Sequence, residues 1–299
     1  MIPIFPEFKL LEFSDKEELE LHAAKYEPYS DFEFASLWAW NVQENMEVSR
    51  IYNNIAIRFT DYITGAFFYT FIGDNEVNET TKELISLSEQ KNYGSILHLI
   101  PEEAVAKLDP VAFDIEESRD HFDYLYEVEQ HVTYSGGKLK SRRNFLNGFQ
   151  KNHPHYGAVP LDLADELTRR EVLDLCRRWE QNKGYPIPNE QRAIARFLDV
   201  AEHFNYSAVG VTVDSTLVGF CITVLLHDGR ANALFEKVDV NFHGIHSLVR
   251  HEVAKSLLRL GYTHFNYEQD LGILSLRQSK KTFNPTRFLK KYSIQLSGS

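Results

Sequence analysis

The sequence predicts an α/β protein whose sheets mix antiparallel and parallel strands. Runs rich in β-branched and aromatic residues alternate with runs whose apolar residues recur at helical spacing. In the second half, three strand-like runs follow one another, and an amphipathic run separates the third from a fourth. Such a run is typical of a crossover helix, which makes the two strands that it joins parallel. The composition, 43% hydrophobic and 25% charged, is that of a globular protein.

The first half begins with a short strand and a helix. Ser14 is a suitable N-cap, and Glu17 three residues later completes a capping box for a helix through Tyr26. An aromatic-rich helical run follows around Trp38. The further elements expected before the midpoint are paired strands at 51–60 and 62–72, a helix at 79–91, and strands at 95–100, 113–115 and 122–128.

A break at Gly136-Gly137 precedes a predicted connecting helix, which runs from Lys138 to Asn152 and ends before Pro154. We therefore expect an N-terminal domain at 1–134, a connecting helix at 135–154 and a C-terminal domain at 155–299.

The second half repeats the order of the first more clearly. Amphipathic helices are predicted at 165–182 and 190–204. Asp214-Ser215 and Asp228-Gly229 supply the turns between the three consecutive strands. The last elements expected are a crossover helix at 245–260, a strand at 264–268 and a final strand at 287–296.

Several features predict a cytoplasmic protein. No apolar run approaches the roughly 18–20 residues that span a bilayer, and the first residues do not resemble a secretion signal. Cys176 and Cys221 lie in apolar patterns, so we expect buried thiols and no disulfide.

Charge is divided unevenly along the chain. Residues 1–130 hold 27 acids and 9 bases, whereas the remainder holds 16 acids and 23 bases. This asymmetry favours an anionic ligand for the second half, or an acidic first half that only maintains solubility.

The element order resembles the GNAT acyltransferase fold, present twice. Short motifs resemble the C-terminal domain of phosphatidylglycerol lysyltransferases, which is related to Fem-type aminoacyltransferases. These motifs are Ser30-Asp-Phe-Glu-Phe, Leu37-Trp-Ala-Trp40, Asp123-Tyr-Leu-Tyr126, Gly137-Lys-Leu-Lys-Ser-Arg-Arg-Asn144 and Glu268-Gln-Asp-Leu-Gly272, followed by Leu276-Arg277, Lys280 and Pro285.

The resemblance implies two tandem GNAT-like domains and an acyl transfer. It implies aminoacyl-tRNA as the donor, with a lipid head group or another small acceptor. Acyl-coenzyme A is the alternative donor, but the loop Asn241–His246 has one glycine where coenzyme A users of this fold show more. A non-catalytic module that binds anions is a third interpretation. We expect tRNA and an anionic lipid head group or small amine as partners, and no transmembrane segment.

Three carboxylates are candidates for proton transfer. Glu268 and Asp270 are two residues apart at the end of a predicted strand, so alternation places both on one face. Burial and mutual proximity would raise the pKa of one toward neutrality, as a general base requires. Alternatively, Asp270 caps the Gly272 turn and Glu268 pairs with Arg277 or Lys280. Glu236 ends the third strand, where it is either catalytic or bridged to Lys280.

The expected substrate-binding residues are mostly cationic. Arg277 and Lys280 lie three apart on a predicted helical turn and could clamp a phosphate or neutralise the nearby acids. Arg143 and Asn144 belong to a family motif, and their basic helix could follow an RNA backbone or simply be solvated. Asn266 precedes the acids. The twelve histidines show no metal-ligand spacing, so no metal is expected.

Overall fold

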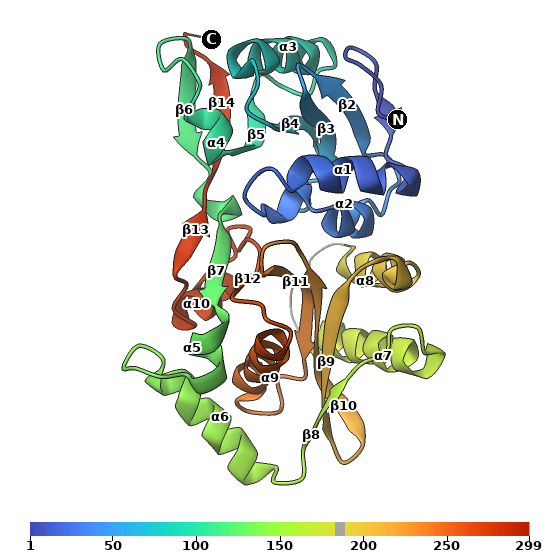
Figure 1. Cartoon of the computed structure of the whole chain (residues 1–299), viewed down its shortest axis with the longest axis vertical. Helices are drawn as coiled ribbons and strands as arrows, with labels where there is room; N and C mark the ends of the chain where they lie inside the picture. Colours follow the sequence, from blue (N-terminus) through green and yellow to red (C-terminus); the bar gives the residue numbers. More distant parts are fainter. Residues whose placement is uncertain (183–188, 299) are drawn as a thin grey trace. The chain divides into compact units, whose positions relative to one another are not determined.

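The computed structural model describes residues 1–182 and 189–298 (Figure 1), and the chain forms two compact units. Unit 1 contains residues Met1–Asp123, Gln269–Gly272 and the segment from Leu289 onward. Unit 2 contains Tyr124–Glu268 and Ile273–Phe288.

Unit 1 is built on two antiparallel sheets. The first has the order β1-β2-β3-β4 and the second has the order β5-β14-β6. The bounds of these strands are Lys9–Leu10 (β1), Glu47–Ile51 (β2), Asn54–Thr60 (β3), Phe67–Ile72 (β4), Leu97–Pro101 (β5), Phe113–Glu117 (β6) and Lys291–Leu296 (β14). The helices of the unit are α1 (Lys16–Ala23), α2 (Phe34–Trp40), α3 (Val77–Gln90) and α4 (Glu102–Val105).

The core of unit 1 lies between α3 and these strands. Leu84 and Ile85 of α3 are buried against Phe71 of β4, Ile100 of β5 and Ile294 of β14. Apolar residues at helical spacing on α3 and at alternate positions of the strands therefore produce one shared core.

Unit 2 is built on one mixed sheet with the order β13-β7-β12-β11-β10-β9-β8. Figure 1 shows α9 on one face of this sheet and α7 and α8 on the other. The strands are β7 (Asp123–Glu127), β8 (Gly157–Pro160), β9 (Tyr206–Val213), β10 (Thr216–Leu225), β11 (Arg230–Val238), β12 (His264–Asn266) and β13 (Arg287–Leu289). The helices are α5 (Val128–Thr133), α6 (Lys140–Asn152), α7 (Glu166–Asn182), α8 (Glu190–Leu198), α9 (Ile245–Arg259) and α10 (Leu274–Thr282).

The central prediction for the second half is confirmed. β9, β10 and β11 are consecutive antiparallel strands, and α9 carries the chain from β11 to the parallel β12. Leu248, Val249, Val253 and Leu257 form the buried side of α9, as their helical spacing predicts.

The predicted domain boundaries differ from the division of the structure. β7 and α5 belong to unit 2, although they precede residue 134, and β14 belongs to unit 1 although it is near the C-terminus. Each unit thus contains a strand that the prediction assigned to the other half. Side-chain alternation identifies the buried face of a strand but not its neighbour in a sheet. It therefore did not reveal that β7 pairs within unit 2 and β14 within unit 1.

Two further elements differ from the predictions. The helix from Lys140 to Asn152 is not a connector, because α6 packs against α9 inside unit 2. The predicted final strand at 287–296 is interrupted at Lys290, and its two parts pair in different sheets.

Candidate active site

The candidate site lies where β11 and β12 diverge in unit 2. β11 pairs with β10 from Ala231 to Val238, but it meets β12 only from Arg230 to Asn232. Beyond that point, the described part of the chain places no strand on the β12 side of β11. Glu236 lies in the part of β11 that has no strand on this side.

The carboxylate of Glu236 is held by three side chains. His246 Nδ1 lies 2.9 Å from Oε1, and the Tyr267 hydroxyl donates a hydrogen bond of 2.5 Å to Oε2. Arg250 Nε lies 3.6 Å from Oε2. Burial alone would raise the pKa of Glu236. The hydrogen bond from His246 and the charge of Arg250 together outweigh burial and lower that pKa to about 2. Glu236 is therefore ionised at neutral pH.

His246 occupies the first turn of α9, and its side chain is 45% exposed. Because Glu236 is ionised, its oxygen can only accept, so the hydrogen bond requires a proton on Nδ1. In the neutral imidazole this leaves the lone pair on Nε2. His246 was not among the predicted site residues, because no pattern in the sequence connects it with Glu236, which lies on another element.

Arg250 places a permanent positive charge beside the carboxylate of Glu236. Its guanidinium lies between the rings of Tyr267 and Phe283, 3.7 and 3.9 Å from their centroids, and the residue is 4% exposed. Burial lowers the pKa of Arg250, but Tyr267, Tyr126 and Glu236 raise it above its ordinary value. Arg250 therefore stays charged and favours the ionised form of Glu236.

The nearby thiol is not a nucleophile. Burial raises the pKa of Cys221 to about 12, so the thiolate is not populated at neutral pH. Both cysteines are buried and free, which confirms the prediction of two buried thiols.

Helix α6 covers the loop before α9. A Cβ built on Gly244 would lie 2.4 Å from the carbonyl oxygen of Phe145, and φ of Gly244 is +88°. The rings of Phe145 and His243 also contact each other, at 5.0 Å between centroids. The backbone of α6 therefore lies directly against the start of α9.

The structure separates the two acids that were predicted to share a face. β12 ends at Asn266, and Glu268 has a φ of +54°, so strand alternation does not extend to Asp270. The Glu268 carboxylate lies 3.4 Å from the Asn232 amide nitrogen in unit 2, whereas Asp270 belongs to unit 1. The prediction of a common face is wrong because the strand is shorter than the sequence pattern indicates.

Asp270 and Asn266 both stabilise the backbone after β12. Asp270 is fully buried, accepts a 3.0 Å hydrogen bond from the Gly272 N–H and lies 3.2 Å from Arg119. Asn266 Oδ1 accepts a 2.7 Å hydrogen bond from the Glu268 N–H. The alternative role predicted for Asp270, capping the Gly272 turn, is confirmed.

Arg277 and Lys280 lie on α10, but in different surroundings. Arg277 is partly exposed, whereas Lys280 is 6% exposed and donates a hydrogen bond to the Tyr267 carbonyl. The partners of Glu236 are His246, Tyr267 and Arg250, so the predicted bridge from Glu236 to Lys280 is wrong. A role for Arg277 in anion binding stays a prediction.

The motif residues on α6 also divide between interior and surface. Arg143 donates to the carbonyl of Tyr134, which ends α5 in a left-handed conformation, and Arg142 lies over Phe145 and Phe283. Asn144 is exposed. Lys140, Asn144, Asn147 and Lys151 are exposed polar residues along one side of the helix.

Unit 1 contains a buried ionic cluster that the sequence analysis did not identify. Lys291 is fully buried, forms an ion pair with Asp31 and lies 2.7 Å from Asp123. Ser30 donates through its N–H and its hydroxyl to Asp123. Burial lowers the pKa of Lys291, but the two carboxylates raise it overall. The available signal was the charge in the two motifs that begin at Ser30 and Asp123.

Comparison with known proteins decides the family. The family model "Phosphatidylglycerol lysyltransferase, C-terminal" matches residues 23–295. The chain belongs to this family. A crystal structure of a conserved protein of unknown function from Bacteroides thetaiotaomicron has a TM-score of 0.84, with 23% identity over 99% of this chain and 100% of that one. The structure of L-PGS from Bacillus licheniformis has a TM-score of 0.62, with 13% identity over 99% and 93% of the two chains.

A curated relative matches a smaller part. An uncharacterised protein of Mycoplasmoides gallisepticum is 23% identical over 180 residues, and this match spans only 56% of that protein and 58% of this chain. The family and the fold neighbours together indicate an aminoacyltransferase- or acyltransferase-like domain, and they confirm the mixed α/β, GNAT-like prediction.

Two further observations concern only the residues that the structure describes. None of their helices is both long and apolar enough to cross a bilayer. Nor do three or more histidine, cysteine or acidic side chains gather there in a way that could hold a metal ion.

Proposed function

We propose that this member of the lysyltransferase family transfers an aminoacyl group from aminoacyl-tRNA to an amine or hydroxyl acceptor, with His246 as the general base. The observation that carries the proposal is the hydrogen bond between His246 and the ionised Glu236 at the open end of β11. A carboxylate that fixes the tautomer of a half-exposed imidazole is an arrangement for removing a proton.

The reaction would proceed as an acyl transfer. Nε2 of His246 accepts a proton from the acceptor as its nitrogen or oxygen attacks the ester carbonyl carbon. The bond between that carbon and the ribose oxygen breaks, and the proton passes from His246 to the leaving oxygen. Glu236 stays ionised and stabilises the imidazolium, while Arg250 keeps the pKa of Glu236 low. Tyr267 holds the second carboxylate oxygen in place.

Two other acids were candidates for this step. Glu268 is partly exposed and near Asn232, so it is the second candidate for the base. The contacts of Asp270 favour a role in the Gly272 turn. Arg277 is our candidate for holding an anionic group of a substrate.

The surface of α6 favours an RNA donor. No acid occurs between Glu129 and Asp162, a stretch that holds five lysines and arginines in a chain of net charge −11. Lys140 and Lys151 are exposed on one side of α6, whereas Arg142 and Arg143 are engaged in unit 2. Exposed lysines on a helix without acids suit contact with a phosphate backbone.

The acceptor is proposed from the family alone. The family description names phosphatidylglycerol, so a lipid head group is the first acceptor to test, and a small amine is the second. Coenzyme A-dependent transfer is the competing function, because strand splay and a helix start are common to both. The contact between Gly244 and Phe145 argues against it, since α6 lies where the pyrophosphate would bind.

The proposal is tested by binding and transfer with charged tRNA. Lys140→Ala/Lys151→Ala should weaken tRNA binding and reduce the slope of log affinity against log salt by roughly 0.7–0.9 per lost contact. Lys82→Ala, an exposed lysine of unit 1, is the matched control. Binding of acetyl-coenzyme A without binding of tRNA would favour the competing function. Binding of tRNA without transfer to any acceptor would indicate a binding module.

A further inference from the structure

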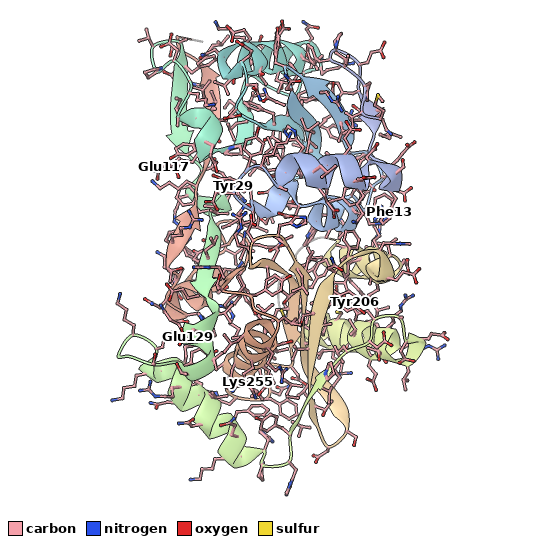
Figure 2. The ribbon with its side chains drawn as sticks, viewed as in Figure 1. Phe13, Tyr29, Glu117, Glu129, Tyr206 and Lys255 are labelled. Carbon is pink, nitrogen blue, oxygen red and sulfur yellow. The ribbon has the colours of Figure 1, made fainter. Side chains whose placement is uncertain are left out.

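A cavity of about 540 Å³ lies at the edge of the unit 2 sheet, away from the proposed active site. Its walls come from β8, β9 and the C-terminal half of α9, and Figure 2 labels Tyr206 and Lys255 from two of these walls. His246 and Ser256 are ten residues apart on α9, which corresponds to about 15 Å along the helix axis. The cavity is therefore distinct from the Glu236–His246 pair.

One part of the wall is apolar and accessible. β8 is the last strand at this edge of the sheet, and its residues Ala158, Val159 and Pro160 line the cavity. Val159 is 39% exposed and Leu260, which follows α9, is 53% exposed. Apolar side chains that face an open cavity of this size gain free energy when an apolar ligand covers them.

The polar part of the wall presents hydrogen-bond donors. Lys255 lies 3.0 Å from both carboxylate oxygens of Glu252, so the two charges neutralise each other. The hydroxyls of Ser207 and Ser256 are 2.9 Å apart, and one hydroxyl hydrogen remains available after they bond to each other.

Arg259 is the remaining charge of the cavity. It is exposed, and it has no hydrogen-bond or ion-pair partner among the residues that the structure describes. It lies three residues after Ser256, and this spacing places both on one side of α9. A guanidinium with free donors beside a free hydroxyl hydrogen recognises a carboxylate or a phosphate.

We propose that this cavity binds a single-chain amphiphile with one anionic head group. The head group, a carboxylate or a phosphate, would bind Arg259 and the Ser207–Ser256 pair. The apolar chain would cover Val159, Pro160 and Leu260. A cationic ligand is disfavoured because the acid of the cavity, Glu252, is already paired with Lys255.

The test is calorimetric titration of the whole chain with octyl phosphate and with octanoate, which separates the two head groups. Inorganic phosphate and 1-octanol supply the head or the chain alone. At least one of the two amphiphiles should bind. Its affinity should exceed that of inorganic phosphate and that of 1-octanol by about tenfold or more. Arg259→Ala should weaken binding by about tenfold or more, the usual effect of losing a charge-assisted hydrogen bond. Val159→Asp should also weaken binding, because the negative charge of aspartate on the apolar wall repels an anionic ligand.

Two controls identify the site. Lys151→Ala removes an exposed cation of α6 and should leave the affinity unchanged, as should His246→Ala, which alters the proposed active site but not the cavity. Three results would each overturn the proposal: no binding of either amphiphile, unchanged binding by Arg259→Ala, or equally tight binding of 1-octanol.

Discussion

Replacement of Glu236 by glutamine tests the electrostatic account of the site. Glutamine retains the size of the side chain but removes the charge that faces Arg250 and His246, and it keeps only one of the two acceptor oxygens that His246 and Tyr267 use. The pKa of Glu236 is about 2 in the folded protein, against an ordinary value of 4.5. At about 1.4 kcal/mol per pKa unit, the ionised form contributes about 3 kcal/mol to the free energy of unfolding at pH 7.

The pH dependence follows from the sign of this shift. Because folding lowers the pKa, the contribution is complete above about pH 4.5 and is lost as the pH falls through 2. Urea unfolding should therefore show Glu236→Gln to be about 3 kcal/mol less stable than the unmodified protein at pH 7, and roughly half as much less stable at pH 3.

A control separates this effect from the loss of any carboxylate. Glu166 is exposed and pairs with Arg170 one helical turn away, so Glu166→Gln should change stability by less than about 0.5 kcal/mol at either pH. A Glu236→Gln protein that is as stable as the original at pH 7, or whose deficit is equal at pH 7 and pH 3, would refute the reasoning.

Other substitutions test separate parts of the structure. Lys291→Met leaves Asp31 and Asp123 buried without their cation and should cost about 3–5 kcal/mol in urea unfolding, part of which a second change, Asp31→Asn, should restore. Gly244→Ala places a Cβ against the Phe145 carbonyl at a positive φ and should lower stability by more than about 1 kcal/mol, whereas Gly137→Ala, with open space around it, should change it by less than about 0.5 kcal/mol. Asp270→Ala removes both the pair with Arg119 and the acceptor of the Gly272 N–H and should cost about 1–3 kcal/mol; no loss of stability would contradict the capping role.

The elements that the sequence predicts well are those with a strong local pattern. The helical spacing of α9 and the turns around Asp214 and Gly229 specify the central part of unit 2 from short segments. The membership of β7 and β14 depends on contacts with distant segments. Lys291 at the start of β14 pairs with Asp31 and Asp123, and this charge pairing favours its position in unit 1, which hydrophobic periodicity cannot express.

The candidate site follows the same division. Glu236 was predicted because it ends the third strand of the second half, ahead of the crossover helix. Its partners were missed, since His246, Arg250 and Tyr267 come from α9 and from the segment after β12. Glu268 and Asp270 were placed on one face by extending β12 two residues too far, and a left-handed backbone at Glu268 ends that pattern. Single-residue conformations of this kind have weak sequence signals outside glycine.

The most direct test of the proposed reaction is the single-turnover rate at which a labelled aminoacyl group leaves tRNA for an acceptor, measured with phosphatidylglycerol vesicles and with a small amine. His246→Ala should retain tRNA binding and lower this rate by about 10²–10⁴-fold, the usual contribution of a general base, while His155→Ala, an exposed histidine elsewhere in unit 2, should not change it. An unchanged rate in His246→Ala would contradict the account.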